Sequence, residues 1–329
     1  MKGKGIIIAG IIFSLVGIGI AGVSAKFAYD DVEELVKDAK IKHGHYDLTE
    51  NDKITIECNA GTMNVYRSET GTSYVDYDIY DFFYCKYDSE DNELKAGLQK
   101  KYWWLFWKNL DKNVVNVYLA GDDYEAYLDL NAGKFTINDD LNFKSLDLDV
   151  SAGKFVTNNT LTVEKSADIY ISAGDININN LVVGEDALLK VSAGDFDIDN
   201  LTVNGNAEFK VSAGDLTVKK ASVTGNSTLN VSAGDMTFAE LKTKKMEARV
   251  SAGDIKIDKL ESDDIKFNIS AGDISMKLVG SVDEFNIDID KSAGSCNLDK
   301  AERHQIVTGS DKKIEGDISA GKATILFTD

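Results

Sequence analysis

A four-residue signature, Ser-Ala-Gly-Asp, recurs about every twenty residues and constrains the fold of this chain more than any other feature. Variant copies, in which another residue follows the glycine, extend the series in both directions. The recurring glycines are Gly133, Gly153, Gly174, Gly194, Gly214, Gly234, Gly253, Gly272, Gly294 and Gly321. Neighbouring glycines are 19 to 22 residues apart, apart from a last step of 27. Such a period is typical of a solenoid, in which each repeat is one rung stacked on the last.

The residues on both sides of each signature alternate between apolar and polar side chains. In one repeat the apolar residues are Val191, Phe196 and Ile198, and the intervening Asp197 is polar. This alternation indicates short strands that bury one face. The alanine falls in phase with the apolar residues, so we expect it to point inward, and the glycine to permit positive φ or a close backbone approach. The sequence therefore predicts an all-β chain folded as a parallel β-solenoid of about ten rungs.

An apolar segment without charged residues, Gly5–Ala25, precedes the repeats. As a helix, its length is roughly 31 Å, close to the hydrocarbon thickness of a bilayer. Lys2 and Lys4 precede it and acidic residues follow it, which places the N-terminus inside the cell. We favour a single-pass transmembrane anchor with residues 1–4 in the cytoplasm and the C-terminal domain outside. The small residues Val23–Ala25 leave a cleaved signal peptide, and hence a secreted protein, as the alternative.

The rest of the chain divides into a juxtamembrane part and the solenoid. Residues 26–50 are expected to form a short amphipathic helix and a polar linker that contains His43 and His45. The solenoid takes residues 51–329, with an aromatic insertion at about 66–128 in which Tyr74–Lys86 is expected to form one long strand. The insertion holds the densest aromatic cluster, Tyr102, Trp103, Trp104 and Trp107. This cluster either caps the open end of the first rung or forms a platform for sugar rings or a membrane surface.

These segments together resemble a known bacterial family. A lead strand ITIECNAGTMNVY from Ile54, a second segment NVVNVYLAGDDYEAYLDLNAGKFTI from Asn113 and the repeated VSAGD are similar to the putative-adhesin domain of unknown function. The resemblance covers about residues 54–327. It implies a β-strand-repeat domain behind a single membrane segment and a role at the cell surface. Relatives are associated with envelope stress, which also implies a sensor. The resemblance names no ligand and transfers no catalytic residue.

Charge and residue usage exclude several classes of function. The formal net charge is −19, from 36 basic and 55 acidic residues, which disfavours binding to nucleic acid or to anionic lipid. Cys58 and Cys296 fall in phase with apolar residues, and no CxxC spacing exists, so we expect core cysteines and no zinc site. The central repeats are nearly uniform, whereas an enzyme concentrates its catalytic acids and bases in one groove. We therefore expect no enzymatic activity and no cofactor.

The aspartates of the signature are the strongest candidates for a metal site. If the rungs stack in register, carboxylates lie about 5 Å apart and repel one another. We expect local backbone amides, with Lys190, Lys210 or Arg249 nearby, to offset this repulsion. Calcium bridging is the alternative, with weak candidate ligands Asp175, Asp195, Asp197, Asp215 and Asp235.

These observations predict a non-enzymatic adhesin or scaffold of the cell surface that binds envelope or extracellular ligands. The partners would be the membrane, through the N-terminal helix, and a cell-wall polymer or a membrane protein. A membrane-tethered sensor of envelope stress and a calcium-stabilised spacer are the alternatives.

Overall fold

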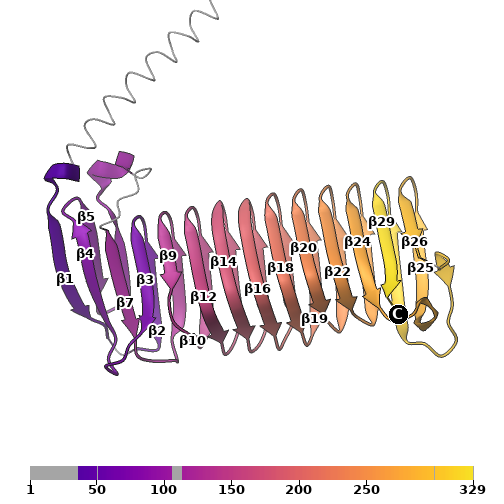
Figure 1. Cartoon of the computed structure of the whole chain (residues 1–329), viewed down its shortest axis with the longest axis horizontal. Coiled ribbons are helices and arrows are strands. Elements are labelled where there is room, and N and C mark those ends of the chain that lie inside the picture. The colour runs from indigo at the N-terminus through magenta and orange to yellow at the C-terminus, as the bar shows by residue number, and fades with distance from the viewer. Residues whose placement is uncertain (1–35, 50, 106–112, 300, 329) are drawn as a thin grey trace, which may run out of the picture.

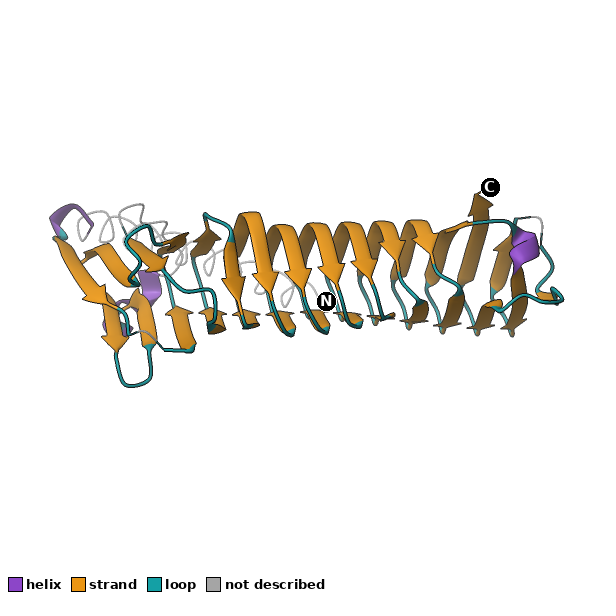
Figure 2. Cartoon of the chain, turned by 90° about the horizontal axis from the view of Figure 1, so that it is seen from below, coloured by secondary structure: helices purple, strands orange, loops and turns teal. Residues whose placement is uncertain are grey.

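Strands that bury alternate side chains form two long sheets, which face each other along the molecule (Figures 1 and 2). The computed structural model describes residues 36–49, 51–105, 113–299 and 301–328. Among these residues, helical turns occupy residues 36–38, η1 (Lys100–Leu105) and η2 (Val282–Glu284).

The strands of each sheet are named here in the order in which they pair. Sheet A consists of β1 (Ile41–Asp47), β4 (Tyr74–Tyr80), β7 (Val114–Leu119), β3 (Thr62–Arg67), β9 (Lys134–Ile137), β12 (Lys154–Val163), β14 (Gly174–Val183), β16 (Gly194–Val203), β18 (Asp215–Val223), β20 (Asp235–Lys242), β22 (Asp254–Glu261), β24 (Asp273–Val279), β29 (Lys322–Thr328) and β26 (Ser295–Leu298), with β10 (Leu141–Phe143) beside β12. Sheet B consists of β27 (His304–Gln305), β25 (Phe285–Lys291), β28 (Lys312–Ile318), β23 (Asp264–Ile269), β21 (Lys245–Val250), β19 (Asn226–Val231), β17 (Ala207–Val211), β15 (Ala187–Val191), β13 (Ala167–Ile171), β11 (Ser145–Val150), β8 (Glu125–Leu130), β2 (Lys53–Cys58), β6 (Glu93–Leu98) and β5 (Phe83–Asp88).

Each central rung combines one strand from each sheet. Strand β15 of sheet B leads through a corner into β16 of sheet A, and a turn at 204–206 returns the chain to β17 in sheet B. Successive rungs pair in parallel and in register, so that Val191 lies opposite Val211 and Asp195 opposite Asp215. The prediction of an all-β chain with long parallel sheets in a solenoid-like arrangement is confirmed.

Inward-facing side chains fill the space between the sheets. Val191, Val211 and Val231 form one column, and each is almost completely buried. Phe209 of sheet B meets Phe238 of sheet A edge to face, with ring centroids 5.1 Å apart. Burying a side chain of this size contributes roughly 1.5–3 kcal/mol relative to leaving it exposed, so these columns supply the main stabilisation of the rod.

The corner between the two strands of a rung differs from its expected form. The alanines of the signature are exposed, as at Ala193. The backbone ladder nevertheless continues around the corner, where Ala193 N donates to Ser172 O at 3.0 Å. The prediction of an inward alanine is therefore wrong. A Cβ atom on Gly194 would lie 2.7 Å from the amide nitrogen of Gly174, in the rung below. Gly194 has a φ of 105°, but Gly253 has no such positive φ and is equally crowded, so close backbone approach is the shared requirement.

At the N-terminal end the rungs do not stack in chain order. Strands β2 and β3 pair directly with β8 and β9, and Lys134 N donates to Gly61 O at 2.9 Å. The strands between them in the chain, β4 to β7, stack on the other side of β2 and β3. There β6 and β7 continue the parallel pairing, while β5, β4 and finally β1 pair antiparallel.

At the C-terminal end the last rung in the sequence is not the last rung in space. Strands β28 and β29 lie between the rung formed by β23 and β24 and the rung formed by β25 and β26. The expectation that each repeat stacks on the one before it is therefore wrong here. Residues 299–311, which include β27, carry the chain back around the end of the rod.

Several local predictions need correction. Residues 74–86 do not form one long strand, because β4 belongs to sheet A and β5 to sheet B, with a break between Tyr80 and Phe83. His43 and His45 lie in β1, within sheet A, and not in a linker. The predicted anchor Gly5–Ala25 lies outside the described residues. Within the part of the chain that is described, no helix has the length and apolar character needed to cross a membrane.

Candidate functional site

The aspartates of the signature form a column on sheet A, where the strands leave the corner. Strand pairing places in line Asp175, Asp195, Asp215, Asp235, Asp254 and Asp273. Lys154 continues the column at one end and Lys322 at the other. Asp197, the remaining metal candidate, follows Asp195 two positions along β16, and its pKa is raised, first by burial and then by the charge of Asp195. Among the described residues, no three His, Cys, Asp or Glu side chains come together as a metal site.

The expected counter-charges of this column lie elsewhere. Lys210 is in sheet B and pairs with Glu208 at 2.8 Å, and Arg249 pairs with Glu247 in the same sheet. Lys190, also in sheet B, lies over the ring of Tyr170. The basic residues in register with the column are instead the lysines at its two ends.

The aromatic cluster of the insertion is described only in part. Tyr102 lies in η1, is partly buried, and packs against Phe82 with ring centroids 5.5 Å apart. Trp103 and Trp104 belong to the same helical turn, but their side chains, like the whole of Trp107, lie outside what the structure describes.

A second group of aromatic rings, which the sequence does not reveal, lies on the outer face of sheet A near its N-terminal end. Tyr66, Tyr118, Tyr74 and His45 come from four neighbouring strands and stack in that order, with ring centroids 5.2, 4.4 and 5.6 Å apart. Burial is the largest cause that raises the pKa of Tyr118, and the neighbouring Tyr74 is the second. The rings face one another, so they present edges to solvent, and the stack joins the inserted strands to the solenoid. The strand pairing that creates it was not readable from the sequence.

A cavity of about 520 Å³ lies at the end of the rod opposite β1. Strands β25, β27 and β28 and the connection between the last two line it. Residues with polar side chains in its lining include Asp288, His304, Ser310, Asp311, Lys313 and Glu315. Ile306, at its rim, is 91% exposed, the largest exposure among the described large apolar side chains. We name this feature the distal cavity.

The charged groups of the distal cavity are mostly paired with one another. His304 Nδ1 lies 2.7 Å from Asp288 Oδ1, across the antiparallel pair of β27 and β25. Lys313 Nζ lies 3.2 Å from Glu315 Oε1 and 3.7 Å from Asp264 Oδ2, and these carboxylates raise its pKa. Because Lys313 is already shared between two carboxylates, the lining keeps an excess of negative charge.

The distal cavity was not predicted from the sequence. Residues 301–313 form a mostly polar stretch before the last strand pair, and no repeat signature lies within them. An isolated Ile306 in this polar stretch is the signal that was available, but the cavity depends on β25 and β28 lying side by side, against chain order.

The solved structures that match the chain include three proteins from bacteria. They include a putative adhesin from Bacteroides fragilis NCTC 9343, at 14% identity, 88% coverage of this chain, 97% of that chain and a TM-score of 0.31. A putative lipid binding protein from Parabacteroides distasonis ATCC 8503 matches at 14% identity, 89% and 98% coverage and a TM-score of 0.44. A putative adhesin from Parabacteroides merdae ATCC 43184 matches at 12% identity, 89% and 98% coverage and a TM-score of 0.30.

None of the curated proteins matches the chain. The family model described as Toastrack DUF4097 matches residues 51–328, which is nearly the whole of the two-sheet solenoid. The chain therefore belongs to the Toastrack DUF4097 family.

Proposed function

We propose that this protein is a non-enzymatic, membrane-tethered binding protein of the cell surface, in which the solenoid holds the distal cavity away from the membrane. The observation that carries the proposal is the position of that cavity, at the opposite end of the rod from β1 and so from the predicted anchor Gly5–Ala25. Each rung adds about 4.8 Å. The thirteen steps from β1 to β26 in sheet A would therefore hold the far end of the rod roughly 60 Å from β1.

The lining of the distal cavity favours a ligand that carries both a cationic and an apolar group. Asp288, Asp311 and Glu315 supply carboxylates, and Ile306 supplies an apolar surface at the rim. Amines of peptides, of amino sugars and of envelope polymers all have the charge that complements this lining. We therefore propose an envelope or extracellular ligand of this class.

The surroundings of Ser310 support a binding role over a catalytic one. His304 and Asp288 pair in the same cavity, but the hydroxyl of Ser310 donates to the carbonyl oxygen of Glu284 and accepts from Lys312 N at 3.1 Å. A serine nucleophile needs its hydroxyl hydrogen-bonded to the general base. The hydroxyl of Ser310 is engaged with the backbone instead.

The test is recovery of envelope material by the full chain in detergent or nanodiscs. Wild type is expected to retain an amine-bearing envelope polymer or peptide, and acetylation of the amines is expected to abolish retention. Ile306→Ser, which removes the apolar surface without adding charge, is expected to reduce retention at least tenfold, and Asp288→Asn several-fold. Asp235→Asn, in the aspartate column, removes the same charge far from the cavity and is expected to bind like wild type. Equal loss in Asp235→Asn and Asp288→Asn would contradict a role for the distal cavity.

A further inference from the structure

The last strand pair of the sequence occupies a slot between two rungs that precede it. Strand β28 lies between β23 and β25, and β29 lies between β24 and β26. The chain skips this slot through residues 280–284, a longer turn than residues 262–263 between β22 and β23. Residues 312–328 then enter the slot after residues 299–311. What the slot accepts is decided by the side chains that line it.

Lys291 shows why the rung of β25 and β26 cannot stack next to β23 in chain order. Lys291 lies opposite Ile318, in the inward column that continues to Ile269. It is exposed because its rung is the last of the stack. In chain order Lys291 would lie between Ile269 and Ile318, where a charged ammonium group would lose its water without gaining a partner. A lysine in the apolar column therefore marks this rung as the end of the rod.

The ring of Phe267 sterically limits which strand can lie next to β23. Its ring is almost fully buried in β23, directly opposite Gly316 of β28. A Cβ atom on Gly316 would lie 2.7 Å or less from three atoms of this ring. Ile289, which follows Gly316 in the same column, would take the glycine's place if the rungs stacked in chain order. With its ring in this position, Phe267 leaves room only for glycine opposite it, whereas Phe209 of the same column lies between Leu189 and Leu229.

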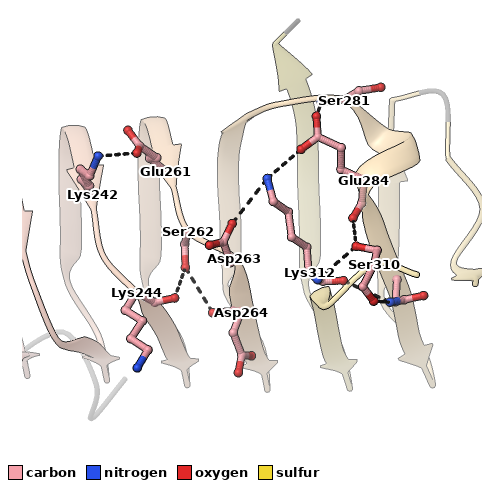
Figure 3. Close-up of polar contacts among 11 residues, drawn as sticks. Lys242, Lys244, Glu261, Ser262, Asp263, Asp264, Ser281, Glu284, Ser310 and Lys312 are labelled. Carbon is pink, nitrogen blue, oxygen red and sulfur yellow. Dashed lines mark hydrogen bonds and ion pairs between the residues drawn. The ribbon is translucent and has the colours of Figure 1, made fainter. Parts of the chain in front are cut away.

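Ion pairs at the turn fasten the inserted strand from both sides (Figure 3). Lys312 Nζ lies 2.7 Å from Glu284 Oε2, just before β25, and 3.5 Å from Asp263 Oδ1, just before β23. Glu284 is itself held by a capping box with Ser281. Because Lys312 contacts both neighbouring rungs, it holds them on either side of the inserted rung.

We propose that the space between β23/β24 and β25/β26 is an acceptor site for a β-strand pair, and that its ligand is the chain's own residues 312–328. Gly316 opposite Phe267 selects the ligand, and Lys291 prevents the end rung from closing the slot when it is empty. The distal cavity, which needs β25 beside β28, forms only when the slot is filled. This inference goes beyond the proposed function and does not depend on any ligand of the cavity.

The first experiment measures strand order with thiol crosslinking in the full chain carrying Cys296→Ser. Ser275, Thr324 and Asn297 occupy one outer column of sheet A, in the spatial order β24, β29, β26. Ser275→Cys with Thr324→Cys, one rung apart, is expected to react with a short bifunctional thiol reagent at least tenfold faster than Ser275→Cys with Asn297→Cys, two rungs apart. The reverse ranking would overturn the proposal.

The second experiment tests whether the contact between Gly316 and the ring of Phe267 decides which strand enters the slot. Gly316→Ile is expected to slow the 275–324 crosslink at least tenfold, and adding Phe267→Ala, which removes the ring, is expected to restore most of the rate. A fluorescent peptide of residues 312–328 should bind the Gly316→Ile chain and not wild type, whose slot is filled. Circular dichroism checks that the other rungs stay folded, and if Gly316→Ile does not fold, Gly316→Ala replaces it. A crosslinking rate unchanged by the substitution, or a loss that Phe267→Ala does not reverse, would refute the proposal.

Discussion

The middle of the solenoid and its two ends are built by different rules. From β12 to β24 each rung stacks in parallel on the rung before it, in chain order and with the same columns. At both ends the chain order is broken, and three of the four outermost strands, β1, β5 and β27, pair antiparallel with their neighbours, while β26 pairs in parallel. The comparison shows that each central repeat contains the residues that determine how it stacks on the next. At an end, individual side chains must instead stop further stacking.

The three histidines of the chain illustrate this difference, because all lie in the outermost strands. His43 contacts Asp78 and His45 contacts Asp76, each across the pair of β1 and β4. His304 contacts Asp288 across β27 and β25. Antiparallel edge strands with charged partners hinder the addition of further strands from other molecules.

The largest expected difference between middle and end comes from removing a buried ring. Phe238→Ala, in the central column, should lower the free energy of unfolding by about 3–5 kcal/mol, because the ring is fully buried and neighbouring rungs cannot collapse into the space. Phe327→Ala, near the C-terminal end and only partly buried, should cost about 1–2 kcal/mol. Urea unfolding of both variants measures this. Equal losses would mean that the ends are packed as tightly as the middle.

The next effect is crowding at a central corner. Gly253→Ala should cost about 1–3 kcal/mol, since its methyl group would lie 2.7 Å from Gly234 N. The exposed Ser251 of the same corner provides the control, and Ser251→Ala should change stability by no more than about 0.5 kcal/mol. At the distal end Gly309→Ala would meet no atom within 4 Å and should cost only about 1 kcal/mol, for its φ of 86°. Thermal unfolding of the three variants gives the ranking.

A smaller difference in local stability between β1 and the central rungs should appear as the pH changes. The pKa of His45 is raised above 6.5 in the folded chain, first by its hydrogen bond to Asp76 and then by Asp47. The stabilisation is therefore complete below about pH 6.5 and disappears as the pH rises through the raised pKa. Hydrogen exchange at β1 amides, corrected for the intrinsic pH dependence, should lose protection over this range, while β16 amides should not. In His45→Asn the protection of the β1 amides should no longer depend on pH. A pH dependence that persists in this variant would mean that another group causes it.

The smallest expected effect is that of calcium on the aspartate column. Its carboxylates lie in a line along the rod, one per rung, and among the described residues they do not converge on one point. The melting temperature should therefore be the same in excess calcium and in chelator. A rise of several degrees that Asp215→Asn reduces would show that neighbouring carboxylates of the column bind the ion.

The central rungs were predictable because their information is local. Val191, Phe196 and Ile198 alternate with polar residues within a few positions of each corner, so burial could be assigned from the sequence. Cys58 was correctly expected in the core, where burial raises its thiol pKa to about 12. The alanine of the corner was misassigned, because alternation was carried through a turn in which Ala193 faces solvent.

The candidate site could not be predicted in the same way. Its lining joins β25, β27 and β28, whose neighbours follow from a break in chain order. One available signal was missed, namely Lys291 at a position where the preceding repeats have valine or isoleucine, as at Val250 and Ile269. It marks the end of the stack, but it does not say which strands fill the space before it.

The sequence by itself determined the rung: the length of the repeat, the inward columns and the crowded glycine at each corner all follow from residues close together in the chain. Only the tertiary structure decided the order of the rungs at the two ends and the cavity that results. The physical reason is that stacking order depends on fit between distant residues. Phe267 and Gly316 are 49 positions apart, and their complementarity is expressed only when the two strands meet.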